Sequence, residues 1–363
     1  MEEDPRFLSE QLITYIGNKR ALLPLIGRGV HAVLQRSGKK KLRIWDAFAG
    51  SGVVSRYFKQ YSSVLYSNDL ETYSRILNTC YLSNHSELDT NEMADTHHRL
   101  LATIEQHPLP GILADSYAPA DDEHIRPGER VFYTRRNAVY LDTARQHIAQ
   151  LPQHLQPYFL APLLTQASVH TNTSGVFKGF HKNNEGIGQF GGRGKNALQR
   201  IMAPISIPLP IFSRFECEHH VLQQDATAAA QTLPELDLAY LDPPYNQHPY
   251  GSNYFMLNLL VEYRRPEHTS KVSGIPTNWN RSPYNAKAKA AASLNELLQA
   301  LKAPFVLISY NSEGFISPQQ MVELLSPHGK VTTMQQDYAT FRGCRNLRNR
   351  STHVNEFLFL LER

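Results

Sequence analysis

The segment "LRIWDAFAGSG", residues 42–52, decides the fold. Its first five residues predict a short buried strand, and the glycines at 50 and 52 predict a tight turn. The next residues, "VVSRYFKQY", carry apolar side chains at helical spacing. A second strand at 63–71, which ends at Asn68-Asp69, and a second helix at 73–84 follow. This alternation predicts a parallel sheet with helices on its faces.

The alternation stops near residue 85, where the pattern becomes helical. Residues 91–107 and 137–151 have apolar side chains at helical spacing, and a long loop broken by prolines separates them. Residues 203–213, "APISIPLPIFS", hold too many prolines for a helix or a central strand. We therefore predict that residues 85–215 form an inserted, mainly helical lobe.

The α/β pattern resumes after residue 215. The sequence predicts strands at 219–226, 236–242, 303–310 and 355–363, and helices at 227–233, 253–263, 286–302 and 317–327. We therefore predict one α/β domain that is formed by residues 1–84 together with residues 216–363.

The composition is that of a globular protein. The chain has 363 residues, 41% of them apolar, which suffices for at least one sizeable core. Its longest apolar runs are much shorter than the roughly 20 residues that cross a bilayer. Its first residues, "MEEDPRF", are acidic and do not have the pattern of a signal or transit peptide. We expect a cytoplasmic protein that does not associate with membranes.

The cysteines and histidines do not form a disulfide or metal-binding pattern. Cys80, Cys217 and Cys344 are far apart, so we expect reduced thiols. The histidine pairs at 97–98 and 219–220 have no carboxylate or cysteine at a ligand spacing. We therefore expect no metal site.

Basic residues are concentrated in two segments, although the net charge is only +4. Residues 177–200 mix lysine and arginine with glycine and aromatic residues, and residues 341–353 hold four arginines and no acid. Such segments suit phosphate contacts and base stacking, and the alternative is a pair of solvated loops. As candidate DNA contacts we take Lys178, Lys182, Arg193, Lys195, Arg342, Arg345, Arg348 and Arg350.

Acids and glycines follow the predicted strands, where a parallel sheet binds its ligands. Gly50 and Gly52 allow the backbone to approach a ligand, and Asp69 follows at about the offset at which an acid binds a ribose. The loop lacks the third glycine of a dinucleotide motif, and the chain has no P-loop motif. These features favour an adenosine ligand without phosphate, and the alternative is a tight turn for close helix packing.

The stretch "LDLAYLDPPYNQHPYGSNYF", residues 236–255, places an acid, two prolines and a tyrosine after a buried strand. The prolines stiffen the turn, so that the Asp242 carboxylate and the Pro243 carbonyl can accept hydrogen bonds while Tyr245 offers a flat ring. This combination suits the exocyclic amino group of a flipped base. The alternative is a rigid turn with a core tyrosine. We expect residues 246–254 to form part of the wall that contacts the base.

Together these motifs resemble a known family. "DPPY" with the upstream "DAFAGSG" resembles the amino-methyltransferases that use S-adenosylmethionine. The start "TYIGNKR", residues 14–20, and the long lobe before "DPPY" resemble the Dam-like D12 class of DNA adenine-N6 methyltransferases, with their α-type motif order. The resemblance is strong over the catalytic part and weak over residues 85–170. It implies a Rossmann-like α/β methyltransferase fold, with a mixed seven-stranded sheet and helices on both faces, and a DNA-recognition role for residues 85–215.

The resemblance also implies S-adenosylmethionine as the cofactor. Residues that would cradle it are Tyr15, Gly17, Asn18 and Lys19. Its methionine side would lie along Phe48, Ala49, Gly50, Ser51 and Gly52, with Asp46 near its amino group. Asp69 would hold its ribose, and Asp225 would meet its adenine amine.

The target base would be bound, by the same resemblance, by Asp242, Pro243, Pro244 and Tyr245. One segment departs from the family. Where the family often carries "FNxPxG", this chain has "GQFGGRGK" at 188–195, which bears on target contacts rather than on the reaction.

The predicted activity is therefore site-specific methylation of adenine N6 in double-stranded DNA, within a restriction-modification system. We expect a monomer, with a cognate restriction endonuclease as a partner. The alternatives are an RNA base methyltransferase that acts on guanine N2 or adenine N6, a cytosine-N4 DNA methyltransferase, and a catalytically silent nucleic-acid-binding subunit. Cytosine-N4 enzymes more often have serine where Asp242 stands.

Overall fold

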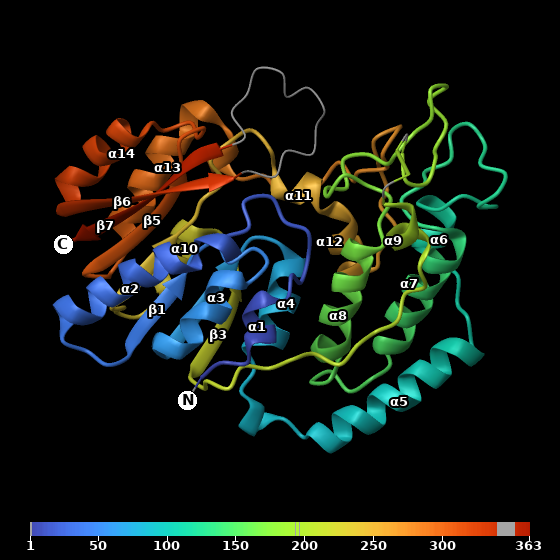
Figure 1. Cartoon of the computed structure of the whole chain (residues 1–363), viewed down its shortest axis with the longest axis horizontal. Helices are drawn as coiled ribbons and strands as arrows, with labels where there is room; N and C mark the ends of the chain where they lie inside the picture. Colours follow the sequence, from blue (N-terminus) through green and yellow to red (C-terminus); the bar gives the residue numbers. More distant parts are fainter. Residues whose placement is uncertain (1, 193, 196, 340–352) are drawn as a thin grey trace.

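A computed structural model describes residues 2–192, 194–195, 197–339 and 353–363 (Figure 1). Within these residues the strands form one mixed seven-stranded sheet in the order β3-β2-β1-β4-β5-β7-β6. Strands β1 to β5 are parallel, and β7 is antiparallel between β5 and β6. The predicted sheet is thereby confirmed. Its strands are β1 (Leu42–Asp46), β2 (Ser62–Asp69), β3 (Glu218–Gln223), β4 (Leu238–Leu241), β5 (Phe305–Asn311), β6 (Lys330–Ala339) and β7 (His353–Glu362).

The central strands are mostly apolar because both of their faces are buried. Ile44 and Leu307 pack on one face of the sheet, whereas Trp45 and Val306 pack on the other. The first face is covered by α2 (Leu23–Ser37) and α3 (Val53–Phe58). The second face is covered by α10 (Ala226–Thr232), α13 (Lys287–Ala300) and α14 (Pro318–Leu325). Helices on both faces were predicted and are confirmed.

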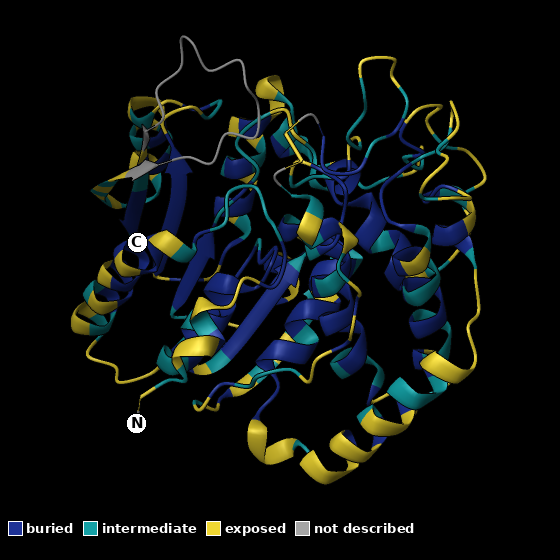
Figure 2. Cartoon of the chain, turned by 45° about the vertical axis from the view of Figure 1, so that its right-hand side comes forward, coloured by how far each residue is buried: buried dark blue, intermediate teal, exposed yellow. Residues whose placement is uncertain are grey.

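Between α4 (Thr72–Leu82) and β3 the described chain forms helices and no strand. These are α5 (Thr90–Gln106), α6 (Ile112–Ser116), α7 (Arg135–Ile148), α8 (Gln156–Val169) and α9 (Leu198–Met202). They lie beside the sheet, with α5 at the outside (Figure 1), and α5 is exposed along one side whereas α8 is largely buried (Figure 2). Their core continues into the α/β part, because Leu141 and Leu163 belong to the same apolar cluster as Tyr73 and Leu257.

The predicted helices at 91–107 and 137–151 are confirmed as α5 and α7. The prediction of a continuous loop between them is wrong at one point, because this segment contains the short helix α6. This short helix is capped by a remote side chain, because the Asp142 carboxylate of α7 accepts hydrogen bonds from the N–H groups of Gly111, Leu113 and Ala114 (2.8–3.0 Å). The sequence around α6 gives no indication of this cap, because Asp142 is about 30 residues away along the chain.

The remaining described elements are short, apart from α12. They are α1 (Pro5–Ser9), α11 (Tyr250–Asn253), α12 (Phe255–Glu262) and the 3-10 helices η1 (Arg20–Leu22), η2 (Lys59–Tyr61), η3 (His85–Glu87), η4 (Pro283–Asn285) and η5 (Ser326–His328). Among the described helices, none has both the length and the apolar character that a membrane span requires.

Helix α2 lies directly against the sheet at Gly29, where a Cβ would be 2.8 Å from a methyl carbon of Leu307 and 2.9 Å from one of Leu358. Gly29→Val should therefore push the helix outward and lower the free energy of unfolding by about 1–3 kcal/mol. Urea unfolding followed by circular dichroism measures this change. Gln35→Val, at an exposed position of the same helix, is the control and should cost less than about 1 kcal/mol. Equal losses in the two variants would contradict the close packing of α2.

Candidate active site

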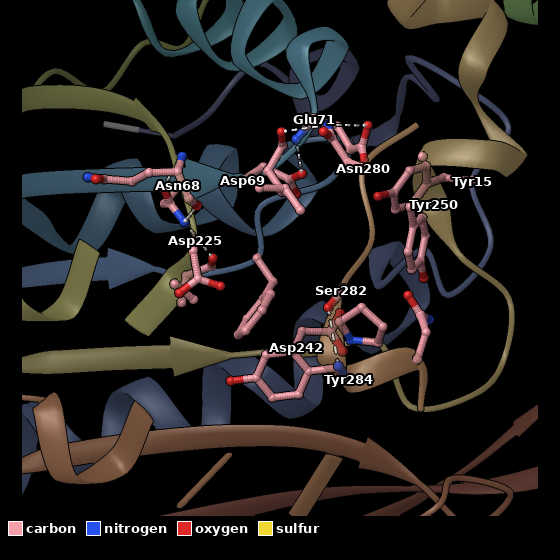
Figure 3. Close-up of a pocket in the computed structure, with 18 residues that line it drawn as sticks. Tyr15, Asn68, Asp69, Glu71, Asp225, Asp242, Tyr250, Asn280, Ser282 and Tyr284 are labelled. Atoms are coloured by element: carbon pink, nitrogen blue, oxygen red, sulfur yellow. Dashed lines mark hydrogen bonds between the residues drawn. The ribbon is translucent and has the colours of Figure 1, made fainter. Parts of the chain in front are cut away.

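A pocket opens where β1, β2, β3 and β4 end, at the point where the strand order reverses between β1 and β4. Its empty volume, including the open mouth, is about 680 Å³. Figure 3 shows side chains around it that follow β2, β3 and β4, among them Asp69, Asp225 and Asp242. The lining includes four carboxylates, and among the described lining residues there is no lysine or arginine. The four carboxylates belong to Asp69, Glu71, Asp225 and Asp242.

The loop after β1 needs glycine at positions 50 and 52. Both residues have positive φ, +53° at Gly50 and +78° at Gly52. A Cβ on Gly50 would lie 2.7 Å from the ring of Tyr15, and one on Gly52 would lie 2.6 Å from Asn78 Oδ1. The Gly50 N–H donates to Asp69 Oδ2 (2.7 Å), so the carboxylate at the end of β2 also fixes the loop after β1.

Glu71 is a pocket residue that the sequence analysis did not identify. Its carboxylate is buried and accepts hydrogen bonds from the Nδ2 groups of Asn258 (2.6 Å) and Asn280 (3.3 Å). Burial, helped by the negative charge of Asp69, raises the pKa of Glu71 to about 7. The only local signal in the sequence was its position two residues after Asp69, the last residue of β2.

The N-terminal segment lies across the pocket through a group of tyrosines. The rings of Tyr15, Tyr250 and Tyr254 stack on one another: the Tyr15 centroid is 5.0 and 4.9 Å from the other two, which are 6.0 Å apart. The Ile16 N–H donates to the Tyr254 hydroxyl (2.8 Å), and the Tyr250 hydroxyl donates to the Ile16 carbonyl (3.0 Å). Gly17 has φ +74°, and a Cβ there would meet two tyrosine hydroxyls at 3.3 Å.

Lys19 is buried beside Asp242. Its Nζ lies 3.1 Å from Asp242 Oδ1 and 3.9 Å from Glu356 Oε2 of β7. Burial raises the pKa of Asp242 to about 6, although the Lys19 charge opposes this shift. Burial lowers the pKa of Lys19, but the two carboxylates outweigh it and the pKa is raised. At neutral pH Lys19 and Asp242 are therefore both charged.

The turn after β4 carries the predicted base-binding residues. Asp242 and Pro244 line the pocket, and the ring of Tyr245 meets that of Tyr310 at 5.9 Å and 67°. The Asn285 Nδ2 group donates to the Asn246 carbonyl (2.8 Å), which attaches the segment after the turn to η4. A stiff rim of this kind was predicted from the prolines.

The opposite end of the pocket is formed after β3. Asp225 lines the pocket and caps α10, since its Oδ1 accepts hydrogen bonds from the N–H groups of Thr227 (2.9 Å) and Ala228 (3.2 Å). The rings of Phe48 and Tyr284 meet edge to face, with centroids 5.3 Å apart. These two rings give the pocket an apolar wall between its acidic ends.

Several predicted cofactor residues lie outside the lining itself. Asp46 is fully buried, and its Oδ2 accepts a hydrogen bond from Ser55 Oγ (2.6 Å), while its Oδ1 has no hydrogen-bond partner. Burial raises the pKa of Asp46 to about 7. Asn18 Oδ1 accepts a hydrogen bond from the Arg20 N–H (2.8 Å) and so shapes the turn before η1. Ala49 and Ser51 are buried in the glycine loop.

The candidate DNA contacts are only partly described. Lys178 and Lys195 are exposed, and Lys182 lies 5.0 Å from the ring centroid of Phe180. Burial and the charge of Lys178 lower the pKa of His248, in the segment that follows Tyr245. Arg193, Arg342, Arg345, Arg348 and Arg350 lie outside the described residues. No cluster of three or more metal-ligating side chains occurs in the part of the chain that is described.

The sheet order, with the antiparallel β7 between β5 and β6, and the pocket at the strand ends define a Rossmann-like methyltransferase. Residues 15–324 match the D12 class N6 adenine-specific DNA methyltransferase family, and the chain belongs to this family. It is therefore an enzyme, a site-specific DNA methyltransferase that acts on adenine N6. This confirms the predicted family and activity, and nothing in it supports the RNA alternative.

The chain is also similar to named methyltransferases. Type II methyltransferase M.NlaIII from Neisseria lactamica is 29% identical over 361 residues, which cover 97% of this chain and 99% of that protein. Type II methyltransferase M.CviAII from Paramecium bursaria Chlorella virus 1 is 28% identical over 96% of this chain and 98% of its own length. Modification methylase StsI from Streptococcus sanguinis is 28% identical over 96% of this chain but only 52% of its own length, so the chain spans about half of that protein.

The raised pKa of Glu71 makes stability depend on pH. Because its pKa is about 7 in the folded chain and 4.5 in a model peptide, folding takes up a proton between these values. The free energy of unfolding should fall as the pH rises through this range. Glu71→Gln removes the effect and should gain about 1–3 kcal/mol relative to the native chain between pH 5 and pH 7.5.

Urea unfolding of both proteins at the two pH values measures this gain. The control is Glu105→Gln, an exposed carboxylate on α5, which should change the unfolding free energy little at either pH. A gain for Glu71→Gln that is the same at both pH values would show that the carboxyl does not titrate in this range.

Proposed function

We propose that this enzyme transfers the methyl group of S-adenosylmethionine directly to N6 of an adenine that has been extruded from duplex DNA. The observation that carries the proposal is the pocket that extends from Asp225 to Asp242, with four carboxylates and no described cation in its lining. Such a pocket is complementary to a ligand that carries positive charge and no phosphate. It is unsuited to a nucleotide or dinucleotide, whose phosphates would face these acids.

S-adenosylmethionine fits this set of residues, and when bound it supplies a methyl group on a positively charged sulfur. Asp225 would accept a hydrogen bond from its adenine amine, and Asp69 and Glu71 from its ribose hydroxyls. Phe48 and Tyr284 would cover its rings. The glycine loop and Tyr15 would lie along its methionine side, where Asp46 has a buried oxygen without a hydrogen-bond partner.

The target amine would be bound at the other end. Its lone pair is delocalised into the adenine ring, so it is a poor nucleophile. Hydrogen bonds from the amine to the Asp242 carboxylate and the Pro243 carbonyl would favour a pyramidal nitrogen whose lone pair can point at the methyl group. With a pKa of about 6, Asp242 is ionised at neutral pH and can accept such a bond. Tyr245 would stack on the base, and no covalent bond to the enzyme is required.

Residues 85–215 would form the lobe that recognises the DNA target. Extrusion of a base from the duplex costs a few kcal/mol, which contacts to the lobe and stacking on Tyr245 would offset. The exposed lysines of residues 177–200, together with the arginines of residues 341–353, would contact phosphates. Burial and, after it, the charge of Lys178 lower the pKa of His248, and this effect supports a basic segment near the turn that carries Tyr245.

A role in a restriction-modification system is supported by the names of the relatives, two Type II methyltransferases and a modification methylase. A cognate restriction endonuclease would then recognise the same DNA sequence. We propose that the enzyme acts as a monomer in the cytoplasm, where its DNA substrate lies.

Asp242→Ala should still bind S-adenosylmethionine but reduce methylation of duplex DNA by at least about a hundredfold, because the target amine loses its charged acceptor. Transfer of labelled methyl groups measures turnover, and calorimetry measures binding. Glu235→Ala, an exposed carboxylate between α10 and β4, should be as active as the native enzyme. Near-normal turnover by Asp242→Ala would contradict the assignment.

Replacement of both Lys178 and Lys182 by alanine should weaken DNA binding on all sequences alike. If each lysine contacts one phosphate, the slope of log affinity against log salt should become shallower by about 2. Fluorescence anisotropy with two unrelated duplexes at several salt concentrations measures both effects. A changed preference between the duplexes, at an unchanged slope, would instead show that these lysines contact bases.

A further inference from the structure

A buried cluster of three charges lies behind the turn after β4. Lys19 Nζ is 3.1 Å from Asp242 Oδ1 and 3.9 Å from Glu356 Oε2. The side chains of Lys19 and Glu356 are 3% and 4% exposed, whereas that of Asp242 is 18% exposed because it lines the pocket. The cluster therefore has one member that can reach a substrate and two that cannot.

Glu356 enters this cluster because of the reversed strand. Since β7 is antiparallel to β5, its first half lies at the edge of the sheet where the parallel strands end. Glu356 is opposite Asn311, the last residue of β5. Glu356, Leu358 and Leu360 lie on the same face of β7, because alternate residues of a strand share a face. The two leucines are buried in the apolar cluster that contains α2, whereas Glu356 places a carboxylate at the end of this apolar row.

Stability does not explain a carboxylate at this position. Desolvation of a buried ion pair offsets most of its attraction, and replacement by an apolar side chain is often neutral or stabilising. Lys19 would also keep Asp242 as a partner if Glu356 were absent. A leucine would continue the row of Leu358 and Leu360 at lower desolvation cost.

We propose that Glu356 is a positioning residue for methyl transfer, whose carboxylate shares the Lys19 ammonium with Asp242. It thereby holds Lys19 in place and leaves Asp242 with enough negative charge to accept a hydrogen bond from the target amine. This inference rests on the proposed role of Asp242 as that acceptor. Glu356 itself is outside the pocket lining, so it would act through Lys19 and Asp242 rather than by contact with the cofactor or the base.

The arrangement implies opposite effects for the two buried partners. The negative charge of Glu356 raises the pKa of Asp242, and the positive charge of Lys19 lowers it. Without Glu356, Asp242 should therefore ionise at lower pH but be more fully neutralised by Lys19, which makes it a weaker acceptor. Without Lys19, Asp242 should ionise only at higher pH.

Other titratable groups near Asp242 do not account for the expected change in its pKa. Those that interact with it or with Lys19 are Asp46 on β1, Tyr240 on β4, Tyr245 in the turn and Tyr250 on α11. Burial raises the pKa values of Tyr240 and Tyr250 far above neutrality. Asp46 has a pKa of about 7, but it is present in every variant, so differences between variants report the cluster.

The test is the pH dependence of kcat between pH 5 and 9, measured with duplex DNA and saturating labelled S-adenosylmethionine. Glu356→Gln should lower kcat about tenfold and move the midpoint of the acid limb down by about one pH unit. Lys19→Gln should move the midpoint up. Glu356→Asp, which keeps the charge, should restore the native midpoint. Calorimetry should give native affinity of Glu356→Gln for S-adenosylmethionine.

Two further variants keep the test decisive. Glu356→Leu removes the same charge within an apolar row and should give the same shift if the glutamine variant folds poorly. Glu362→Gln, at the other end of β7 and paired with Arg36 at the surface (3.0 Å), should leave both kcat and the midpoint unchanged.

An unchanged midpoint in Glu356→Gln and Glu356→Leu, with kcat lowered equally at all pH values, would overturn the inference and leave Glu356 a structural residue. Weaker S-adenosylmethionine binding would overturn it in favour of a binding role. A failure of the proposed function is distinct from both, because the native enzyme itself would then transfer no methyl group to duplex DNA.

Discussion

The ion pair between Lys19 and Asp242 joins the N-terminal segment to the end of β4, and the site is built around this contact. Two residues before Lys19, the chain turns at Gly17 with positive φ, and a Cβ there would lie 3.3 Å from the hydroxyls of Tyr245 and Tyr250. The same turn presents Tyr15 to the glycine loop after β1, where only a residue without Cβ fits. The N-terminal segment thus connects the cofactor side of the pocket to the base side.

Much of this arrangement follows from a rule about parallel sheets. Because the carboxyl ends of parallel strands lie at one edge, Asp69, Asp225 and Asp242 could be placed together from the sequence before any contact was known. The strands themselves were predictable because β1, β4 and β5 are apolar runs buried on both faces. The glycines and prolines then marked which strand ends carry specialised turns.

The features that the sequence did not reveal depend on long-range packing. Helix α8 is buried nearly all round, so it has no polar face that would mark its period, and α2 carries glycines because the sheet and Tyr57 lie too close for larger side chains. Strand β6 was missed because its sequence, "KVTTMQQDYA", is rich in polar residues. Glu71 and Glu356 gain their importance from Asn258, Asn280 and Lys19, partners brought close only by the fold.

The buried carboxylates of the site favour a positively charged ligand. Asp46, Glu71 and Asp242 have pKa values of about 7, 7 and 6, because burial disfavours their charged forms and Lys19 is the one cation among the described residues that pairs with them. A positively charged ligand in the pocket would favour the charged forms and lower all three pKa values. Its binding would therefore release protons near neutral pH and would strengthen as the pH rises. The carboxylates that lower the free energy of unfolding at high pH would therefore favour cofactor binding at the same pH. Binding of the cofactor would restore part of the stability that their burial costs.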